Sequence, residues 1–205
     1  VLACDEAYYV KPITLRHPLI FYFGHTATFF INKLTLAGLI EQRLNPAFES
    51  TFAVGVDEMS WDDLNDQRYD WPSVEAVRHY RHEVRAVVDR LIRELPLSLP
   101  IGWDDPWWII LMGIEHERIH LETSSVLIRQ HQLKYVRRHP AWAPCRTNGA
   151  APQNTLVDIP AAMFRLGRER SEPLIYGWDN EFGRHDAATA AFQTSRYLVS
   201  NQEFL

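Results

Sequence analysis

The chain has 205 residues, of which 46% are hydrophobic, and its formal net charge is −5 at pH 7. This size and composition suit one large or two small globular domains, and the acidic balance gives no reason to expect nucleic acid or an anionic membrane as a partner. No apolar stretch reaches the roughly 18 residues of a membrane span and no signal peptide is visible, so we expect a cytoplasmic protein.

The first part of the chain has the pattern of a long helix followed by a connection. Apolar residues recur at helical spacing from about Leu15 to Leu44, where Asn45-Pro46 is expected to end the helix. Residues 46–71 are expected to form a long connection, with a short helix near 60–64.

Two further helices follow. Pro72 suits the first turn of a helix that continues to Leu95. Asp105 then offers an acidic cap and Pro106 a first-turn proline for a third helix that continues to about Gln130. Three long helices with sizeable connections favour an antiparallel helical bundle.

The composition changes near residue 140. Residues 141–153 are rich in proline and are expected to be a linker. Residues 154–167 and 192–199 have the β-rich, glycine- and proline-punctuated pattern of short strands and turns. The predicted organisation is a helical bundle over residues 1–140, the linker, and the start of a second domain, cut early, over residues 154–205.

One heptad inside the third predicted helix indicates a metal site. Residues 116–122 read His-Glu-Arg-Ile-His-Leu-Glu. His116 and His120 are four residues apart and so share one helix face, where two imidazoles can bind one divalent metal. Two buried histidines without a metal would need other partners.

The same letters are the signature of zinc hydrolases, with Glu117 as general base. A zinc hydrolase needs a third protein ligand after the motif. The common form uses a glutamate on a following helix, yet none lies between Thr123 and Arg168. His131 and His139 stay open as third ligands, although neither fits a known protease spacing. This interpretation is the weaker alternative.

An iron site needs a third ligand from another helix. His25 lies well inside the first predicted helix and can face the bundle interior, whereas His17 precedes Pro18 and is expected to be a capping or surface residue. Three neutral imidazoles leave positions open for substrates and dioxygen. Glu122 lies about 200° round the helix from His120, so we expect it beside a metal ligand and not on the metal. A bundle that only binds metal or a partner protein is a third alternative.

Three stretches of the chain resemble one family of enzymes. Residues 17–39, 52–64 and 112–130 read HPLIFYFGHTATFFINKLTLAGL, FAVGVDEMSWDDL and MGIEHERIHLETSSVLIRQ. They are similar to the 5-histidylcysteine sulfoxide synthases of ovothiol biosynthesis (OvoA type). The related ergothioneine sulfoxide synthases share the iron motif but not the DEMSWDD segment, and are the alternative within the same chemistry.

The resemblance implies a fold and a metal site. The family has a DinB-like antiparallel helical bundle followed by an α+β domain of the formylglycine-generating-enzyme type, which is C-type-lectin-like. Residues 176–182 and 197–204 resemble the opening of that second domain. Carried over by motif, the three iron ligands of the family fall on His25, His116 and His120, with Fe(2+) as the cofactor.

The resemblance also implies substrates. The family joins the sulfur of L-cysteine to the imidazole ring of L-histidine in a reaction that uses dioxygen, the first step of ovothiol biosynthesis. Arg78 and Arg81 share a face of the second predicted helix and are candidates to bind a substrate carboxylate, with a solvated basic face as the alternative. The catalytic residues are expected in the rest of the second domain, and a methyltransferase domain commonly follows, so we expect this chain alone to be weak or inactive.

Overall fold

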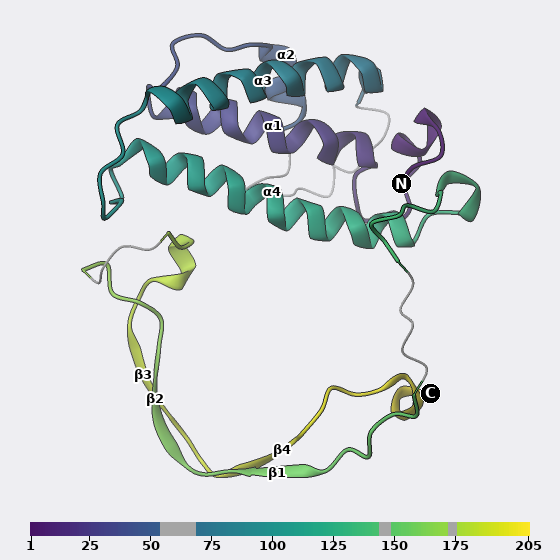
Figure 1. Ribbon diagram of the computed structural model, residues 1–205, viewed down its shortest axis with the longest axis vertical. Helices are drawn as coiled ribbons and strands as arrows, with labels where there is room; N and C mark the ends of the chain where they lie inside the picture. Colours follow the sequence, from purple (N-terminus) through teal and green to yellow (C-terminus); the bar gives the residue numbers. More distant parts are fainter. Residues whose placement is uncertain (54–68, 144–148, 172–175) are drawn as a thin grey trace. The chain divides into compact units, whose positions relative to one another are not determined.

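The computed structural model describes residues 1–53, 69–143, 149–171 and 176–205. The chain forms two compact units, Val1–Pro140 and Ala141–Leu205. The first unit is helical and the second consists mainly of short antiparallel strands (Figure 1). The short helix predicted near residues 60–64 lies outside the described residues, as does most of the stretch 52–64 that carries part of the resemblance.

Three long helices dominate the first unit. The bounds of its helices are η1 Asp5–Tyr8, α1 Leu19–Leu36, α2 Pro46–Thr51, α3 Val74–Glu94, α4 Pro106–Arg129 and η4 Leu133–Tyr135. Helix α1 lies between α3 and α4 and contacts both (Figure 1). A helix covered on two sides is apolar nearly all round, and 12 of the 18 residues of α1 are buried. The mainly helical fold is confirmed, and no described helix is both long and apolar enough to cross a membrane.

Helix α1 is shorter at both ends than predicted. It begins after Pro18, which has an extended conformation at the N-cap, and not at Leu15. Its other end is set by Gly38, whose φ of +69° lies in the left-handed region that favours glycine. The next backbone N–H bonds back to the Leu34 carbonyl at 2.9 Å. The predicted end near Leu44 is therefore wrong, because the helix ends at Leu36, just before Gly38.

The Asn45-Pro46 pair begins a helix and does not end one. The Asn45 side chain accepts a hydrogen bond from the Phe48 N–H at 3.1 Å, and Pro46 occupies the first turn of α2. The buried carboxylate of Glu49 accepts two backbone N–H bonds at 2.9 Å and one from Arg43 at 3.0 Å. The predicted long connection from residue 46 therefore begins with a six-residue helix that was not predicted.

The starts of α3 and α4 agree closely with the predicted ones. The Ser73 side chain accepts a hydrogen bond from the N–H of Ala76 at 3.2 Å, so α3 begins two residues after Pro72. The predicted first-turn position of Pro72 is wrong, because Pro72 precedes the cap. At α4, the Asp105 side chain accepts from the Trp107 N–H at 2.9 Å with Pro106 in the first turn, as predicted. Each cap satisfies a backbone donor that the helix itself leaves unpaired.

Helices α1 and α3 run in the same direction. Ile20 and Val74, near the two starts, belong to one buried cluster. Leu34 and Leu91, near the two ends, belong to another. The long connection that contains α2 returns the chain from the end of α1 to the start of α3 (Figure 1).

Helix α4 runs antiparallel to α1 and approaches it closely. The ring of Tyr22 lies 5.6 Å from that of His120, while Phe30, two turns further along α1, packs on Gly113. A Cβ atom at Gly113 would overlap the Phe30 ring, since even the third-nearest ring atom would be 2.5 Å away. The absence of a side chain at Gly113 therefore lets the two helices meet one turn before His116.

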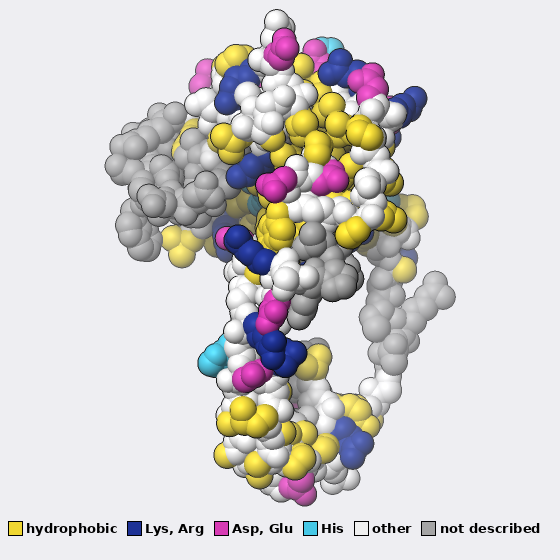
Figure 2. Space-filling model, turned by 90° about the vertical axis from the view of Figure 1, so that its left-hand side faces the viewer, with side chains coloured by type: hydrophobic (Ala, Val, Ile, Leu, Met, Phe, Trp, Pro, Cys, Tyr) yellow, Lys and Arg dark blue, Asp and Glu magenta, His cyan; other side chains and the backbone are white. Residues whose placement is uncertain are grey.

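In the second unit, four short strands pair into one bent, two-stranded ribbon. Its elements are β1 Leu156–Ile159, β2 Ala162–Leu166, η5 Asp179–Glu181, β3 His185–Thr189, β4 Phe192–Ser195 and α5 Asn201–Phe204. Strand β1 pairs with β4 and β2 with β3, both antiparallel and in one continuous register. Hydrophobic side chains lie at its surface (Figure 2), among them Met163, Leu166 and Phe192. The strands predicted at 154–167 and 192–199 are confirmed, while β3 was not predicted.

Candidate metal centre

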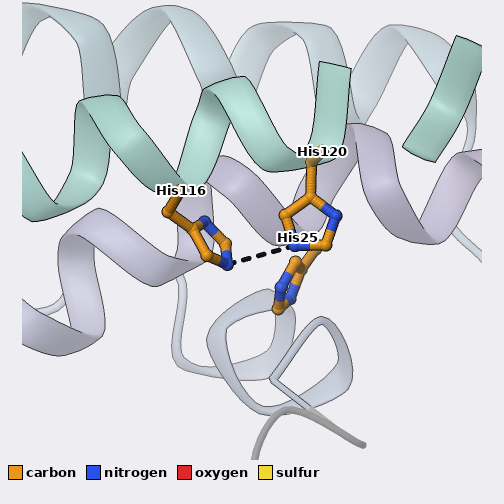
Figure 3. A group of neighbouring side chains, drawn as sticks. All are labelled: His25, His116 and His120. Atoms are coloured by element: carbon orange, nitrogen blue, oxygen red, sulfur yellow. Dashed lines mark hydrogen bonds between the residues drawn. The ribbon is translucent and has the colours of Figure 1, made fainter. Parts of the chain in front are cut away.

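Three histidines converge inside the helical unit. His25 comes from α1, and His116 and His120 come from successive turns of α4 (Figure 3). One ring nitrogen of each lies within 4.8 Å of the corresponding nitrogens of the other two. His25 and His116 are buried and His120 is partly buried. The structure therefore brings together the three residues that the sequence singled out as ligands.

The ring of His25 is held by a backbone acceptor. Its Nδ1 lies 2.7 Å from the carbonyl oxygen of Phe52, just after α2, and a carbonyl can only accept. Nδ1 therefore carries the proton and donates, which leaves the lone pair of Nε2 free to bind a metal. Gly24 makes this approach of the chain feasible, because a Cβ there would lie 2.5 to 2.6 Å from the Phe52 ring.

The two histidines of α4 face each other. Their Nε2 atoms are 3.1 Å apart (Figure 3). In the metal-free protein, one Nε2–H donates to the other Nε2. The Nδ1 atoms of both are buried and make no hydrogen bond within the described ranges. The His116 ring stacks on Phe29 with centroids 3.7 Å apart and an interplanar angle of 11°.

All three histidines are neutral at pH 7. Burial, with the nearby His120, His25 and Lys33, lowers the pKa of His116 to about 3. Burial and His25 lower the pKa of His120 to about 4, against an opposing effect of Glu117. Burial also lowers the pKa of His25, partly opposed by its hydrogen bond to Phe52. Neutral imidazole is the form that binds a metal.

The spacing of the two histidines of α4, and the chemistry of all three, fit a divalent transition metal. Two imidazole nitrogens at metal–nitrogen distances of about 2.1 Å would lie about 3.0 Å apart at a right angle and about 3.4 Å apart at a tetrahedral angle. The two Nε2 atoms of α4 lie at 3.1 Å. Three nitrogen ligands without a thiolate suit iron, zinc, copper or nickel better than magnesium or calcium.

Glu117, the base of the zinc-hydrolase alternative, belongs to an ion pair. Its carboxylate lies 3.1 Å from Nη2 of Arg81. The same guanidinium donates through Nη1 to the Phe23 carbonyl at 2.8 Å and to the Thr26 hydroxyl at 2.6 Å. Arg81 thus links all three long helices. To act as a base, Glu117 would have to leave this pair, which does not favour the hydrolase.

Two cavities meet at the Arg81–Glu117 pair. One, of about 280 Å³, is bordered by this pair, Tyr22 and His120. The other, of about 500 Å³, is also bordered by the pair and by Arg78 and other residues of α3. Arg78 is exposed and lies 2.6 Å from Glu75. A role for either arginine in substrate binding stays a prediction.

Glu122, His17 and His131 are not part of the group of three histidines. Glu122 is exposed on α4 and is not part of the ligand group, so its predicted place beside a ligand stays untested. His17 is buried against Phe21 and Trp71, so its prediction as a capping or surface residue is wrong. His131 is buried beside Tyr135 and is not part of the ligand group either.

The chain is similar to a curated protein and matches a family model. The chain is 27% identical over 212 residues to ergothioneine biosynthesis protein 1 of Neurospora crassa, a match that covers 95% of this chain and 24% of the relative. The chain thus spans about a quarter of the length of this curated relative. Residues 2–124, which include α1, α3 and most of α4, match the family described as the DinB superfamily. The chain therefore belongs to the DinB superfamily.

Proposed function

We propose that this chain is the metal-binding part of a non-haem iron(II)-dependent, oxygen-dependent sulfoxide synthase. The observation that carries the proposal is the convergence of three neutral histidines from two helices on one point. The similarity to a protein of ergothioneine biosynthesis supports the same class of chemistry. In our proposal, His25, His116 and His120 hold Fe(2+), which when bound supplies the one-electron chemistry that dioxygen requires.

The finer proposal is that the enzyme joins the sulfur of L-cysteine to the imidazole of L-histidine, as in ovothiol biosynthesis. Its support is the resemblance of three sequence stretches. The name of the Neurospora relative supports the ergothioneine-type synthase equally. We also propose that residues 154–205 open a formylglycine-generating-enzyme-like domain, because residues 176–182 and 197–204 resemble the opening of such a domain. The two-stranded ribbon carries apolar side chains at its surface, and such a ribbon is marginal alone.

The Arg81–Glu117 pair can bind an amino-acid substrate. The cavity beside His120 is bordered by both residues. The guanidinium of Arg81 suits the substrate carboxylate, and the carboxylate of Glu117 suits its ammonium group. A zwitterion would then replace the internal ion pair with two new ones, so that neither charge is left without a partner.

Iron binding by histidine variants tests the proposal. The 205-residue chain is reconstituted anaerobically with Fe(2+), and bound iron is measured after gel filtration. We expect about one iron per chain, and less than about a tenth of that in His25→Ala, His116→Ala and His120→Ala. The matched control is His79→Ala, an exposed histidine of α3 that should keep full binding. Full iron binding by His25→Ala would contradict the proposed site.

Product analysis separates the two branches of the chemistry. The native protein that contains this chain is supplied with Fe(2+), dioxygen and L-histidine, with either free L-cysteine or a cysteine peptide as the thiol. A sulfoxide formed from free cysteine supports the ovothiol type, whereas a requirement for the peptide contradicts it. Peptidase activity lost in Glu117→Ala would instead support a zinc hydrolase.

A further inference from the structure

Each ligand ring of the cluster needs a fixed orientation, because its lone pair must point at the metal. A hydrogen bond at the second ring nitrogen usually provides this. His25 has such a bond, to the Phe52 carbonyl. The Nδ1 atom of His116 is buried and makes none with any residue that the structure describes. Within the described part of the chain, a contact other than a hydrogen bond at Nδ1 therefore sets the plane of the His116 ring.

The ring of Phe29 makes that contact. It lies parallel to the imidazole of His116 within 11°, with centroids 3.7 Å apart, which is van der Waals contact over the whole ring face. Both residues are buried, with 8% and 7% exposure. Rotation of the imidazole about its Cβ–Cγ bond would drive its edge into the phenyl ring.

We infer that Phe29 is a positioning residue for the metal centre and acts through His116; the inference rests on the proposed metal site. A metal-bound imidazole carries partial positive charge, which the negative face of a phenyl ring attracts. The stack therefore stabilises the metal-bound form of His116 more than the free form. Phe29 is one turn from His25 on α1, so the same helix supplies one ligand and orients another.

Neighbouring residues offer matched variants. Phe29→Leu and Phe29→Met remove the ring but keep an apolar side chain, and Phe29→Tyr keeps the ring. Phe30→Leu removes a ring from the adjacent position, which packs on Gly113 and not on an imidazole. Loss of bundle packing alone should therefore affect the Phe29→Leu and Phe30→Leu proteins alike.

The test is Co(2+) affinity, measured by chelator competition in the whole chain, with the ligand-field absorption spectrum as a second readout. Phe29→Leu and Phe29→Met should lower the affinity about tenfold and change the spectrum, while Phe29→Tyr and Phe30→Leu should keep both. If Phe29→Leu binds and absorbs like Phe30→Leu, the inference fails. A wild-type chain that binds no metal through the three histidines would overturn both this inference and the proposed function. Should Phe29→Leu not fold, the comparison of Phe29→Met with Phe29→Tyr decides.

Discussion

A methyl group at Gly113 should loosen the metal centre without unfolding the bundle. In Gly113→Ala, the third-nearest atom of the Phe30 ring would be 2.5 Å from the new Cβ. Carbon atoms in contact lie about 3.5 to 4.0 Å apart, so the ring or the helix must retreat by at least about 1 Å. Phe30 is only 9% exposed and lies in a buried cluster, so its ring has little room to swing away.

The expected magnitudes follow from two opposing effects. Overpacking costs about 1 to 3 kcal/mol, whereas alanine is favoured over glycine inside a helix by about 1 kcal/mol. The free energy of unfolding should therefore fall by about 1 kcal/mol, or about 2 to 4 °C in Tm for a chain of this size. Metal affinity should fall more, because His116 lies one turn from Gly113 and moves with α4 relative to His25.

The assay compares thermal unfolding of the metal-free protein with Co(2+) affinity measured by chelator competition. We expect the affinity to fall at least about tenfold, a loss typical when metal ligands lose their positioning contacts. Gly149→Ala is the control, since a Cβ there has no atom within 4 Å. Unchanged metal affinity in Gly113→Ala, alongside the expected loss of stability, would refute the idea that this close approach sets the site.

Three further outcomes are expected. Metal-free protein should lose stability as the pH falls from about 6.5 to about 4. The pKa values of His116 and His120 are about 3 and about 4 in the folded state, and about 6.5 in the unfolded chain. Because the unfolded state binds more protons in this range, the free energy of unfolding rises with pH. Urea denaturation at several pH values should show a weaker dependence in a His116→Ala, His120→Ala double variant, and an equal slope would contradict this. Arg81→Lys should lower the free energy of unfolding by about 1 to 2 kcal/mol, because lysine cannot keep three divergent hydrogen bonds. Arg78→Lys, at an exposed pair, should change the free energy of unfolding by less than about 0.5 kcal/mol. Equal effects of the two substitutions in urea denaturation would count against the role of Arg81 as a link between helices. Gly38→Ala should cost about 1 kcal/mol, because its φ is +69°, and an unchanged urea midpoint would be evidence against the left-handed helix end.

Local sequence signals predicted where two helices begin. Features that depend on backbone angles or on pairing with distant residues were not predicted. Asp105 and Pro106 act within one helical turn, so the sequence alone locates the start of α4. The role of Gly38 depends on its backbone angle, which a spacing pattern does not report. Strand β3 reads His-Asp-Ala-Ala-Thr and has little β-propensity; it is a strand because β2 pairs with it.

The candidate site likewise has some features that the sequence predicts and others that only the fold shows. The interval between His116 and His120 is a property of one helix, so the sequence predicts it directly. The Phe52 carbonyl that orients His25 is a backbone group and leaves no side-chain signal in the sequence. The close contacts at Gly24 and Gly113 could be suspected from glycine inside helical patterns, but the rings that fill the space are known only from the fold.

The contacts that pack the core of the bundle therefore also position the metal ligands. Two ligands are fixed relative to each other by helix geometry, while the third depends on the distance between α1 and α4. The missing side chain of Gly113 permits that close approach beside the Phe30 ring, and Phe29 packs on the ring of His116. A binding site tolerates displacements of only a few tenths of an ångström in its ligands, whereas a core can absorb them at modest cost. Added volume at Gly113, which pushes α1 and α4 apart, and loss of the ring of Phe29 should consequently lower metal affinity more than stability. Loss of the ring of Phe30 forces nothing apart, so it should lower stability and keep the metal affinity.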